Sequence, residues 1–180
     1  SFSKTISFSL RVGYVVASEN LIRKFIYFKQ ISDIQTNTLS QYIVHEFLSK
    51  GYLWTHLENL RKKYKKKRDL MTAELSNCRI DGLKVFVPKG GYFLWIELPK
   101  YIKINELMKL LGDMGIVVMP GEVFFSKYNY DNSFIRLNFS YPTEQDIKDG
   151  VKILLECIEK CSIPTLRSRY SVETVINPYL

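Results

Sequence analysis

The stretch from residue 53 to 76 keeps one apolar face at helical spacing through a run of basic side chains, RKKYKKKRD at 61–69. Its apolar positions are Leu53, Leu57, Leu60, Tyr64, Met71 and Leu75. Residues that share a helix face recur every three or four positions, so the pattern predicts one long, continuous helix. The lysines should project from the opposite side as a solvated face, with nucleic-acid contact as the lesser alternative.

The residues before this helix predict one strand and two further helices. The segment LRVGYVVAS at 10–18 has the β-branched and aromatic content of a strand. Ser18 is suited to cap a helix that begins near Glu19. Its apolar face would consist of Leu21, Ile22, Phe25 and Ile26. A further helix is predicted over 37–50, with Gly51 placed to end it.

After residue 79 the pattern changes to short strands and turns. Residues 83–87 and 92–98 predict an antiparallel hairpin joined by Pro88-Lys89-Gly90-Gly91, because glycine adopts the positive φ of tight turns. A helix over 105–114, with Gly115 beyond its end, and a strand over 116–119, stopped by Pro120-Gly121, should follow.

The last part of the regular pattern is a strand followed by a helix. Residues 134–140 alternate, with Ile135, Leu137 and Phe139 on one face and Arg136 and Asn138 on the other. Thr143 should cap a final helix that runs to about 161, with Asp146 in the capping-box position. The order ββαββα predicts an α+β unit with a mostly antiparallel sheet and helices on one face. We expect an irregular tail after Pro164.

Composition limits the class of protein. With 180 residues, 46% of them hydrophobic, the chain can bury the core of one domain or one and a half. The net charge of +8 is compatible with nucleic acid, anionic ligands or a membrane surface and selects none of them. Cys78, Cys157 and Cys161 lack a disulfide or metal-ligand spacing, so we expect a reducing compartment and no metal site. Without an apolar span or a signal peptide, we expect a soluble, cytoplasmic protein.

Several motifs carry a resemblance to a known family. SFSKTISFSLRVGYV at 1–15 resembles the cofactor-lysine segment of class I/II aminotransferases, which are fold-type I, pyridoxal-phosphate-dependent enzymes. It most closely resembles the variety fused to a GntR-type DNA-binding domain in MocR-type regulators. Further motifs follow in the family's order and spacing: Gln41, HLENLRKKYKKKRD at 56–69, PKGGYFLWIELP at 88–99, GIVVMPGEVFF at 115–125 and FIRLNFS at 134–140.

The resemblance implies a set of site residues. Lys4 would hold pyridoxal 5'-phosphate through its amine and then shuttle a proton, while Ser1, Ser3 and Arg11 would bind the cofactor phosphate. Arg136 would bind the substrate's α-carboxylate, because its planar fork suits two parallel hydrogen bonds. Surface roles for Lys4 and Arg11, and a pairing of Arg136 with Asp131 or Glu122, are the alternatives. The family usually has Pro-Gly where Phe8-Ser9 stand here.

The resemblance also implies the organisation of the protein. Residues 1–78 would be the last part of the large cofactor-binding domain with a long connecting helix, 79–164 the small α+β domain and 165–180 the tail. The residues that hold the cofactor ring lie upstream of the lysine in the family, so the chain looks like the C-terminal half of a longer protein. The whole protein, expected to be a homodimer, would be an aminotransferase acting on an amino acid and a 2-oxo acid. The alternatives are a MocR-type regulator that senses an amino-acid-like effector, with DNA bound by a separate domain, and an inactive structural or dimerisation module.

Overall fold

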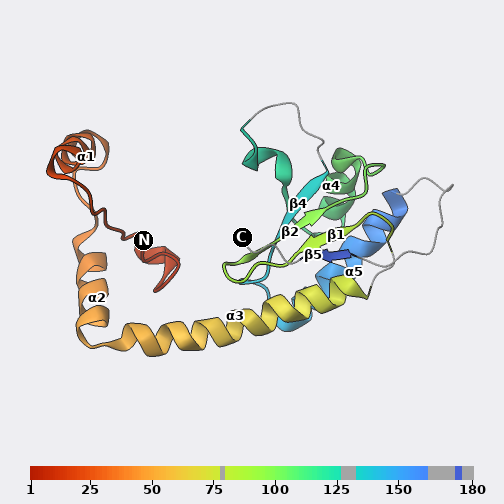
Figure 1. Ribbon diagram of the computed structural model, residues 1–180, viewed down its shortest axis with the longest axis horizontal. Helices are drawn as coiled ribbons and strands as arrows, with labels where there is room; N and C mark the ends of the chain where they lie inside the picture. The colour runs from red at the N-terminus through yellow and green to blue at the C-terminus, as the bar shows by residue number, and fades with distance from the viewer. Residues whose placement is uncertain (78–79, 127–132, 162–172, 176–180) are drawn as a thin grey trace. The chain divides into compact units, whose positions relative to one another are not determined.

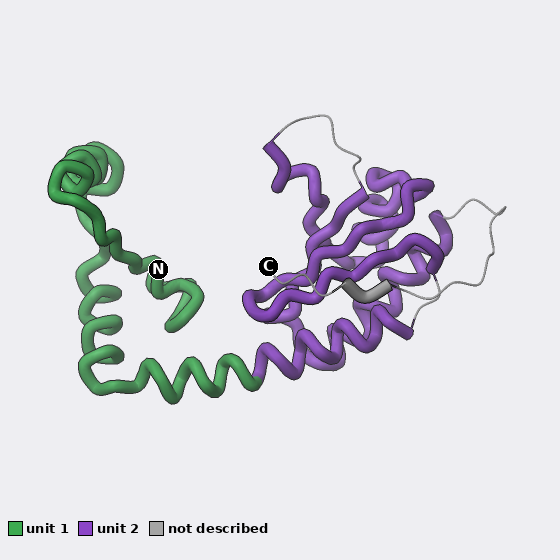
Figure 2. Tube along the Cα trace, in the orientation of Figure 1, with its two compact units in different colours: residues 1–62 green, residues 63–180 purple. Residues whose placement is uncertain are grey.

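The structure, a computed structural model, describes residues 1–77, 80–126, 133–161 and 173–175. The chain divides into two compact units, residues 1–62 and 63–180, which are coloured separately in Figure 2. The domain limits proposed from the sequence, at 78 and 164, remain a prediction.

The first unit holds two helices and the start of a third. Helix α1 spans Glu19–Ser32, α2 spans Thr38–Ser49 and α3 begins at Tyr52. The side chain of Asn37 accepts a hydrogen bond from the Ser40 N–H at 2.9 Å and so caps α2. Gly51, with a φ of 72°, follows the end of α2. The predicted helices are therefore confirmed, although the Ser18 side chain makes no capping hydrogen bond to α1.

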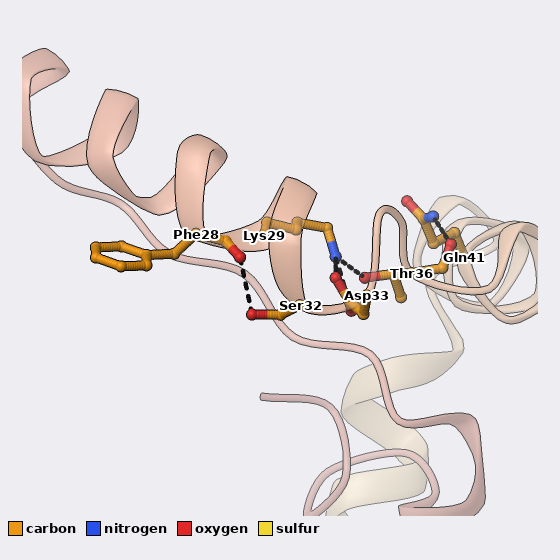
Figure 3. A network of polar contacts seen from close by, with 6 residues as sticks. All are labelled: Phe28, Lys29, Ser32, Asp33, Thr36 and Gln41. Atoms are coloured by element: carbon orange, nitrogen blue, oxygen red, sulfur yellow. Dashed lines mark hydrogen bonds and ion pairs between the residues drawn. The ribbon is translucent and has the colours of Figure 1, made fainter.

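Side-chain hydrogen bonds fix the connection between α1 and α2 (Figure 3). Lys29 Nζ lies 2.9 Å from Asp33 Oδ1 and also donates to Thr36 Oγ1 at 3.2 Å. Gln41 Nε2 donates to the Thr36 carbonyl oxygen at 2.8 Å. A lysine at the end of α1 and a glutamine at the start of α2 thus hold the same linker, which defines the path of the chain between the helices.

The prediction of a strand at 10–18 is wrong. Residues 8–10 form a short 3-10 helix, η1 (Phe8–Leu10), and residues 11–18 form no strand. An extended segment becomes a strand only when its N–H and C=O groups pair with a neighbour, and no described segment forms a ladder with it. The predicted apolar face of α1 is largely uncovered in this chain, since Leu21, Phe25 and Ile26 are exposed.

Helix α3, Tyr52–Ser76, is continuous, as predicted from its apolar period. Most of its lysines are exposed, and Lys66 forms an ion pair of 2.8 Å with Glu144. Lys67 differs from the prediction because it is buried at 7% exposure. Its Nζ donates to the carbonyl oxygens of Ser140, at 3.0 Å, and Pro142. These two acceptors explain how a charged group is accommodated in the second unit. None of the described helices is long and apolar enough to cross a membrane.

The second unit is built on a sheet with the strand order β3-β4-β2-β1-β5 (Figure 1). Strands β1 (Lys84–Phe86), β2 (Phe93–Glu97) and β4 (Phe134–Asn138) pair antiparallel, which confirms the hairpin and the mostly antiparallel sheet.

Two details of the predicted sheet need correction. The strand predicted at 116–119 is instead β3 (Met119–Pro120), because only these two residues pair with β4. Proline is tolerated there since β3 is an edge strand. Within the tail predicted to be irregular, β5 (Glu173–Val175) pairs parallel with β1, and three residues are too few to give a visible pattern.

Helices α4 (Ile104–Asp113) and α5 (Glu144–Cys161) share one core with the inner face of the sheet. Leu94, Ile96 and Ile135 are fully buried at the centre of this core. The predicted capping box starts α5: Thr143 N–H donates to Asp146 Oδ2 at 2.8 Å, and Asp146 N–H donates to Thr143 Oγ1 at 3.1 Å. Each buried aliphatic side chain contributes about 1.5–3 kcal/mol, so this core stabilises the packing of the two helices on the inner face of the sheet.

Candidate functional site

Arg136 lies on the sheet face opposite the helical core. It is opposite Trp95 in the ladder between β4 and β2, and its neighbours Ile135 and Leu137 point into the core. Because side chains alternate along a strand, Phe93, Trp95, Phe134 and Arg136 share the outer face. This is the orientation that the sequence alternation predicts for Arg136.

Two aromatic rings contact the Arg136 guanidinium. Its Cζ atom lies 3.9 Å from the ring centroid of Phe93 and 4.2 Å from that of Phe124. At these distances the negative faces of the rings attract the cation. Nε of Arg136 is buried without a hydrogen-bond partner among the described residues. Asp131, one alternative partner considered from the sequence, lies outside the described residues.

Gly121 allows this aromatic cluster to form. It begins the 3-10 helix η2 (Gly121–Phe124), where a Cβ atom would lie only 2.5 Å from Cβ of Phe134 and 2.9 Å from its carbonyl oxygen. A larger residue would therefore hold η2 away from β4. On β2, Trp95 stacks on Phe134 with centroids 5.5 Å apart and contacts Phe124 edge-on at 5.6 Å.

The cluster borders a pocket of about 470 Å³. The pocket is lined by Phe86, Pro88, Gly90, Gly91, Tyr92, Phe93, Leu94, Trp95, Phe124, Phe125 and Arg136. Burial raises the pKa of Tyr92 above 10.0, and the nearby Tyr64 adds to this shift. Trp95 and Phe124 are not among the site residues predicted from the sequence. The β2 alternation was a usable signal for Trp95, whereas Phe124 comes from a loop whose position depends on Gly121.

Ser1, Ser3 and Arg11 come together in the first unit. The Phe2 N–H donates to the Val12 carbonyl at 2.9 Å, and the Phe2 carbonyl accepts from the Ile6 N–H at 2.8 Å, so the chain closes into a loop. Arg11 Nη1 lies 3.5 Å from Ser3 Oγ, and the Ser3 N–H donates to Ser1 Oγ at 3.3 Å. Two hydroxyls and a permanent cation are thereby gathered at one place.

Arg11 reaches this place although Phe8-Ser9 replace the usual Pro-Gly. It follows η1 directly and adopts a left-handed backbone with a φ of 53°, a conformation that costs a non-glycine residue some strain. Lys4 lies in the turn formed by residues 2–6, ahead of η1, and its side chain is exposed. The structure thus brings Ser1, Ser3 and Arg11 together beside Lys4, while Arg136 belongs to the other unit.

The donors of this loop match the chemistry of a phosphate group. Guanidinium groups and hydroxyls both donate hydrogen bonds to phosphate oxygens, and arginine keeps its charge at every accessible pH. An exposed lysine amine next to them is suited to react with an aldehyde. The residues present therefore fit a phosphate-bearing aldehyde cofactor.

Comparison with known proteins gives a consistent result. The model of the family "Aminotransferase class I and II" matches residues 1–154. The aromatic-amino-acid aminotransferase 1 of Thermococcus litoralis is 36% identical over 89% of this chain and 38% of its own length. The HTH-type transcriptional regulator NorG of Staphylococcus aureus is 35% identical over 89% of this chain and 36% of its own.

A solved structure shows the same fold. The kynurenine aminotransferase of Pyrococcus horikoshii, crystallised with PMP and with KYN as substrate, matches with a TM-score of 0.83 and 34% identity. The match covers 89% of this chain and 39% of that one. The chain spans about two fifths of the length of the relatives it matches, and it has part of the fold of pyridoxal-phosphate-dependent transferases.

Proposed function

The chain belongs to the aminotransferase class I and II family, and on this premise we propose that it is part of a pyridoxal-phosphate-dependent enzyme. The whole protein would transfer an amino group between an amino acid and a 2-oxo acid. The observation that carries the proposal is the approach of Arg11 Nη1 to Ser3 Oγ, 3.5 Å, beside the exposed Lys4.

Four residues near the start of the first unit have a role in this proposal: Ser1, Ser3, Lys4 and Arg11. Ser1 and Ser3 would donate hydroxyl hydrogen bonds to the cofactor phosphate, and Arg11 would add its fixed charge. Lys4 would anchor the cofactor through Nζ and, once released, take up the proton that leaves the substrate's Cα. Pyridoxal phosphate supplies the aldehyde for this link and a ring that withdraws electrons from Cα. Family members depend on this cofactor.

Arg136 would bind the substrate's α-carboxylate. Its guanidinium lines an open pocket, and two parallel hydrogen bonds from one guanidinium to one carboxylate are strong and directional. The groups that hold the cofactor ring would come from another part of the protein. We therefore expect the 180-residue chain alone to bind the cofactor weakly and not to catalyse amino transfer.

A second function is favoured by one observation, the match to NorG. In a regulator of that type, the same residues would bind an amino-acid-like effector and the cofactor, while DNA would be bound by a separate domain. The two functions share every site residue named above. They differ in turnover: only the enzyme releases a new amino acid.

Labelling of the chain with pyridoxal phosphate tests the cofactor site. After borohydride reduction, peptide mass spectrometry should locate the adduct mainly on Lys4 and not on the exposed Lys24 of α1. The Arg11→Gln variant should need roughly 10- to 150-fold more cofactor for the same labelling, because a charged hydrogen bond is worth about 1.5–3 kcal/mol.

Three further measurements complete this test. The Lys24→Arg variant serves as a control and should label Lys4 normally. Inorganic phosphate should compete with the labelling of Lys4. With an amino acid and a 2-oxo acid added, the chain should transfer no more amino groups than its Lys4→Ala variant. Labelling spread evenly over the lysines and over the amino group of Ser1 would refute the assigned site.

A further inference from the structure

The guanidinium of Arg136 is held by two phenylalanine rings that come from different elements. Phe93 is the first residue of β2, and Phe124 is the last residue of η2. Both centroids lie within 4.2 Å of Cζ. Contacts this short to two rings cover much of the flat surface of the guanidinium and restrict the side-chain rotamers of a long residue.

The buried Nε determines which hydrogen-bond donors can reach a ligand. Nε has no partner among the described residues and is closed off from solvent. With Nε inaccessible and the flat surface covered by rings, a carboxylate entering the pocket can be met by the two terminal nitrogens. Paired N–H groups on Nη1 and Nη2 match the two oxygens of one carboxylate.

The lining of the pocket selects the rest of the ligand. Six of its eleven lining residues are aromatic: Phe86, Tyr92, Phe93, Trp95, Phe124 and Phe125. Arg136 is the single charged residue among the eleven, all of which are described. A ligand with a second carboxylate would bury a charge without a partner, whereas an aromatic side chain would meet ring faces and edges.

We propose that Phe93 and Phe124 position Arg136 to bind the carboxylate of an aromatic amino acid or 2-oxo acid. This inference rests on the proposed function, in which Arg136 binds the substrate's carboxylate. The two phenylalanines act through the arginine: they orient its terminal nitrogens toward the pocket. Their removal should therefore weaken the recognition of the carboxylate more than it weakens contact with the aromatic body of the ligand.

A pair of probes separates these two contributions. The first probe is 3-phenylpropionate, and the second is 3-phenylpropionamide, which has the same ring and chain but no charge. Binding is measured from the fluorescence of Trp95 in the whole 180-residue chain, with the exposed Trp54 replaced (Trp54→Phe). The quantity of interest is the ratio of the two dissociation constants, because loss of apolar contact alone weakens both probes equally.

In the parent chain the carboxylate should bind more tightly than the amide. Phe93→Leu and Phe124→Leu should each reduce this preference by roughly twofold to thirtyfold, the range of a cation–π contact. Phe93→Tyr keeps the aromatic ring, so this variant should retain the parent's preference for the carboxylate. Phe28→Leu, the same change at an exposed position of α1, is the matched control and should leave both affinities unchanged.

The outcomes distinguish this inference from the proposed function. If Arg136→Ala leaves the preference intact, the carboxylate role of Arg136 fails and the inference fails with it. If Arg136→Ala removes the preference but both leucine variants keep it, the positioning role alone is wrong. Absence of binding of 3-phenylpropionate to the parent chain at millimolar concentrations would overturn the proposed ligand class. Circular dichroism of each variant verifies that it is folded.

Discussion

Replacement of Gly121 by alanine should destabilise the second unit and loosen the aromatic cluster around Arg136. The added Cβ would lie 2.5 Å from Cβ of Phe134 and 2.9 Å from its carbonyl oxygen. Carbon atoms in comfortable contact are about 3.5–4.0 Å apart, so η2 and β4 must separate by about 1 Å. The nearest atom, Cβ of Phe134, is bonded directly to the backbone of β4. The ladder between β4 and β2 fixes this backbone, so a side-chain rotation cannot move the atom away.

The expected cost follows from known effects of overpacking. Extra methyl groups forced into well-packed sites cost about 1–3 kcal/mol of unfolding free energy. Urea denaturation followed by Trp95 fluorescence, in the Trp54→Phe chain, measures this loss. Gly112→Ala is the control: it lies in α4 with nothing within 4 Å of its Cβ, and alanine should stabilise the helix by about 0.5–1 kcal/mol.

The Gly121→Ala variant also tests the link between packing and the pocket. If η2 moves outward, Phe124 moves from Arg136, and the preference for 3-phenylpropionate over its amide should fall. A Gly121→Ala chain with the parent's stability and the parent's preference would show that η2 is not held against β4 as described.

Two further predictions concern residues that hold the second unit together. Lys67→Met keeps the apolar stem but removes the donor to Ser140 and Pro142, so the free energy of unfolding should fall by about 1–3 kcal/mol. The control, Lys63→Met at an exposed position, should change it by less than about 0.5 kcal/mol. Equal effects of the two variants in urea denaturation would contradict this role of Lys67. Hydrogen bonds from the Thr143 side chain and backbone lower the pKa of Asp146 below 3.8, so its contribution to stability is present above 3.8 and is lost as the pH falls through the folded-state value. Acid denaturation should show Asp146→Asn to be less pH-dependent in this range, and an unchanged acid transition would contradict the assignment.

Local patterns explain which elements could be predicted from the sequence. The limits of α2 and α5 depend on groups within a few residues of the helix ends, such as Asn37 and the pair Thr143 and Asp146. The long period of α3 and the alternation of β4 are equally local. The same alternation was sufficient to place Arg136 on the outer face of the sheet.

The incorrect predictions depend on partners far away in the chain. Residues 10–18 have strand composition, but a strand also needs a neighbour to pair with, and composition contains no information about the neighbour. The solvated position predicted for Lys67 is wrong because its two acceptors lie 73 and 75 residues further along the chain, and no local pattern reports them. The position of Phe124 follows from a close approach of Gly121 to Phe134, and no sequence period reports such a contact.

The candidate cofactor site in the first unit is inferred from resemblance and not from a sequence pattern. Nothing in the spacing of Ser1, Ser3 and Arg11 indicates that their side chains meet, because residues 3 and 11 are brought together by the closed loop between Phe2 and Val12. The sequence contains no signal for how Phe8-Ser9, in place of Pro-Gly, affect the path of the loop. In the structure, Arg11 has a left-handed backbone directly after η1 and approaches Ser3 with Phe8-Ser9 in place.

The parallel pairing of β5 with β1 determines how far the chain can be shortened from its C-terminal side before an edge of β1 is exposed. Without β5, β1 would become the outermost strand, and the backbone N–H and C=O groups of Lys84–Phe86 that now meet Glu173–Val175 would be open to another molecule. Exposed edges of this kind template intermolecular strand addition and aggregation. A chain cut after α5, which ends at Cys161, would therefore lose this pairing. In the folded chain, residues 173–175 therefore cover the outer edge of β1.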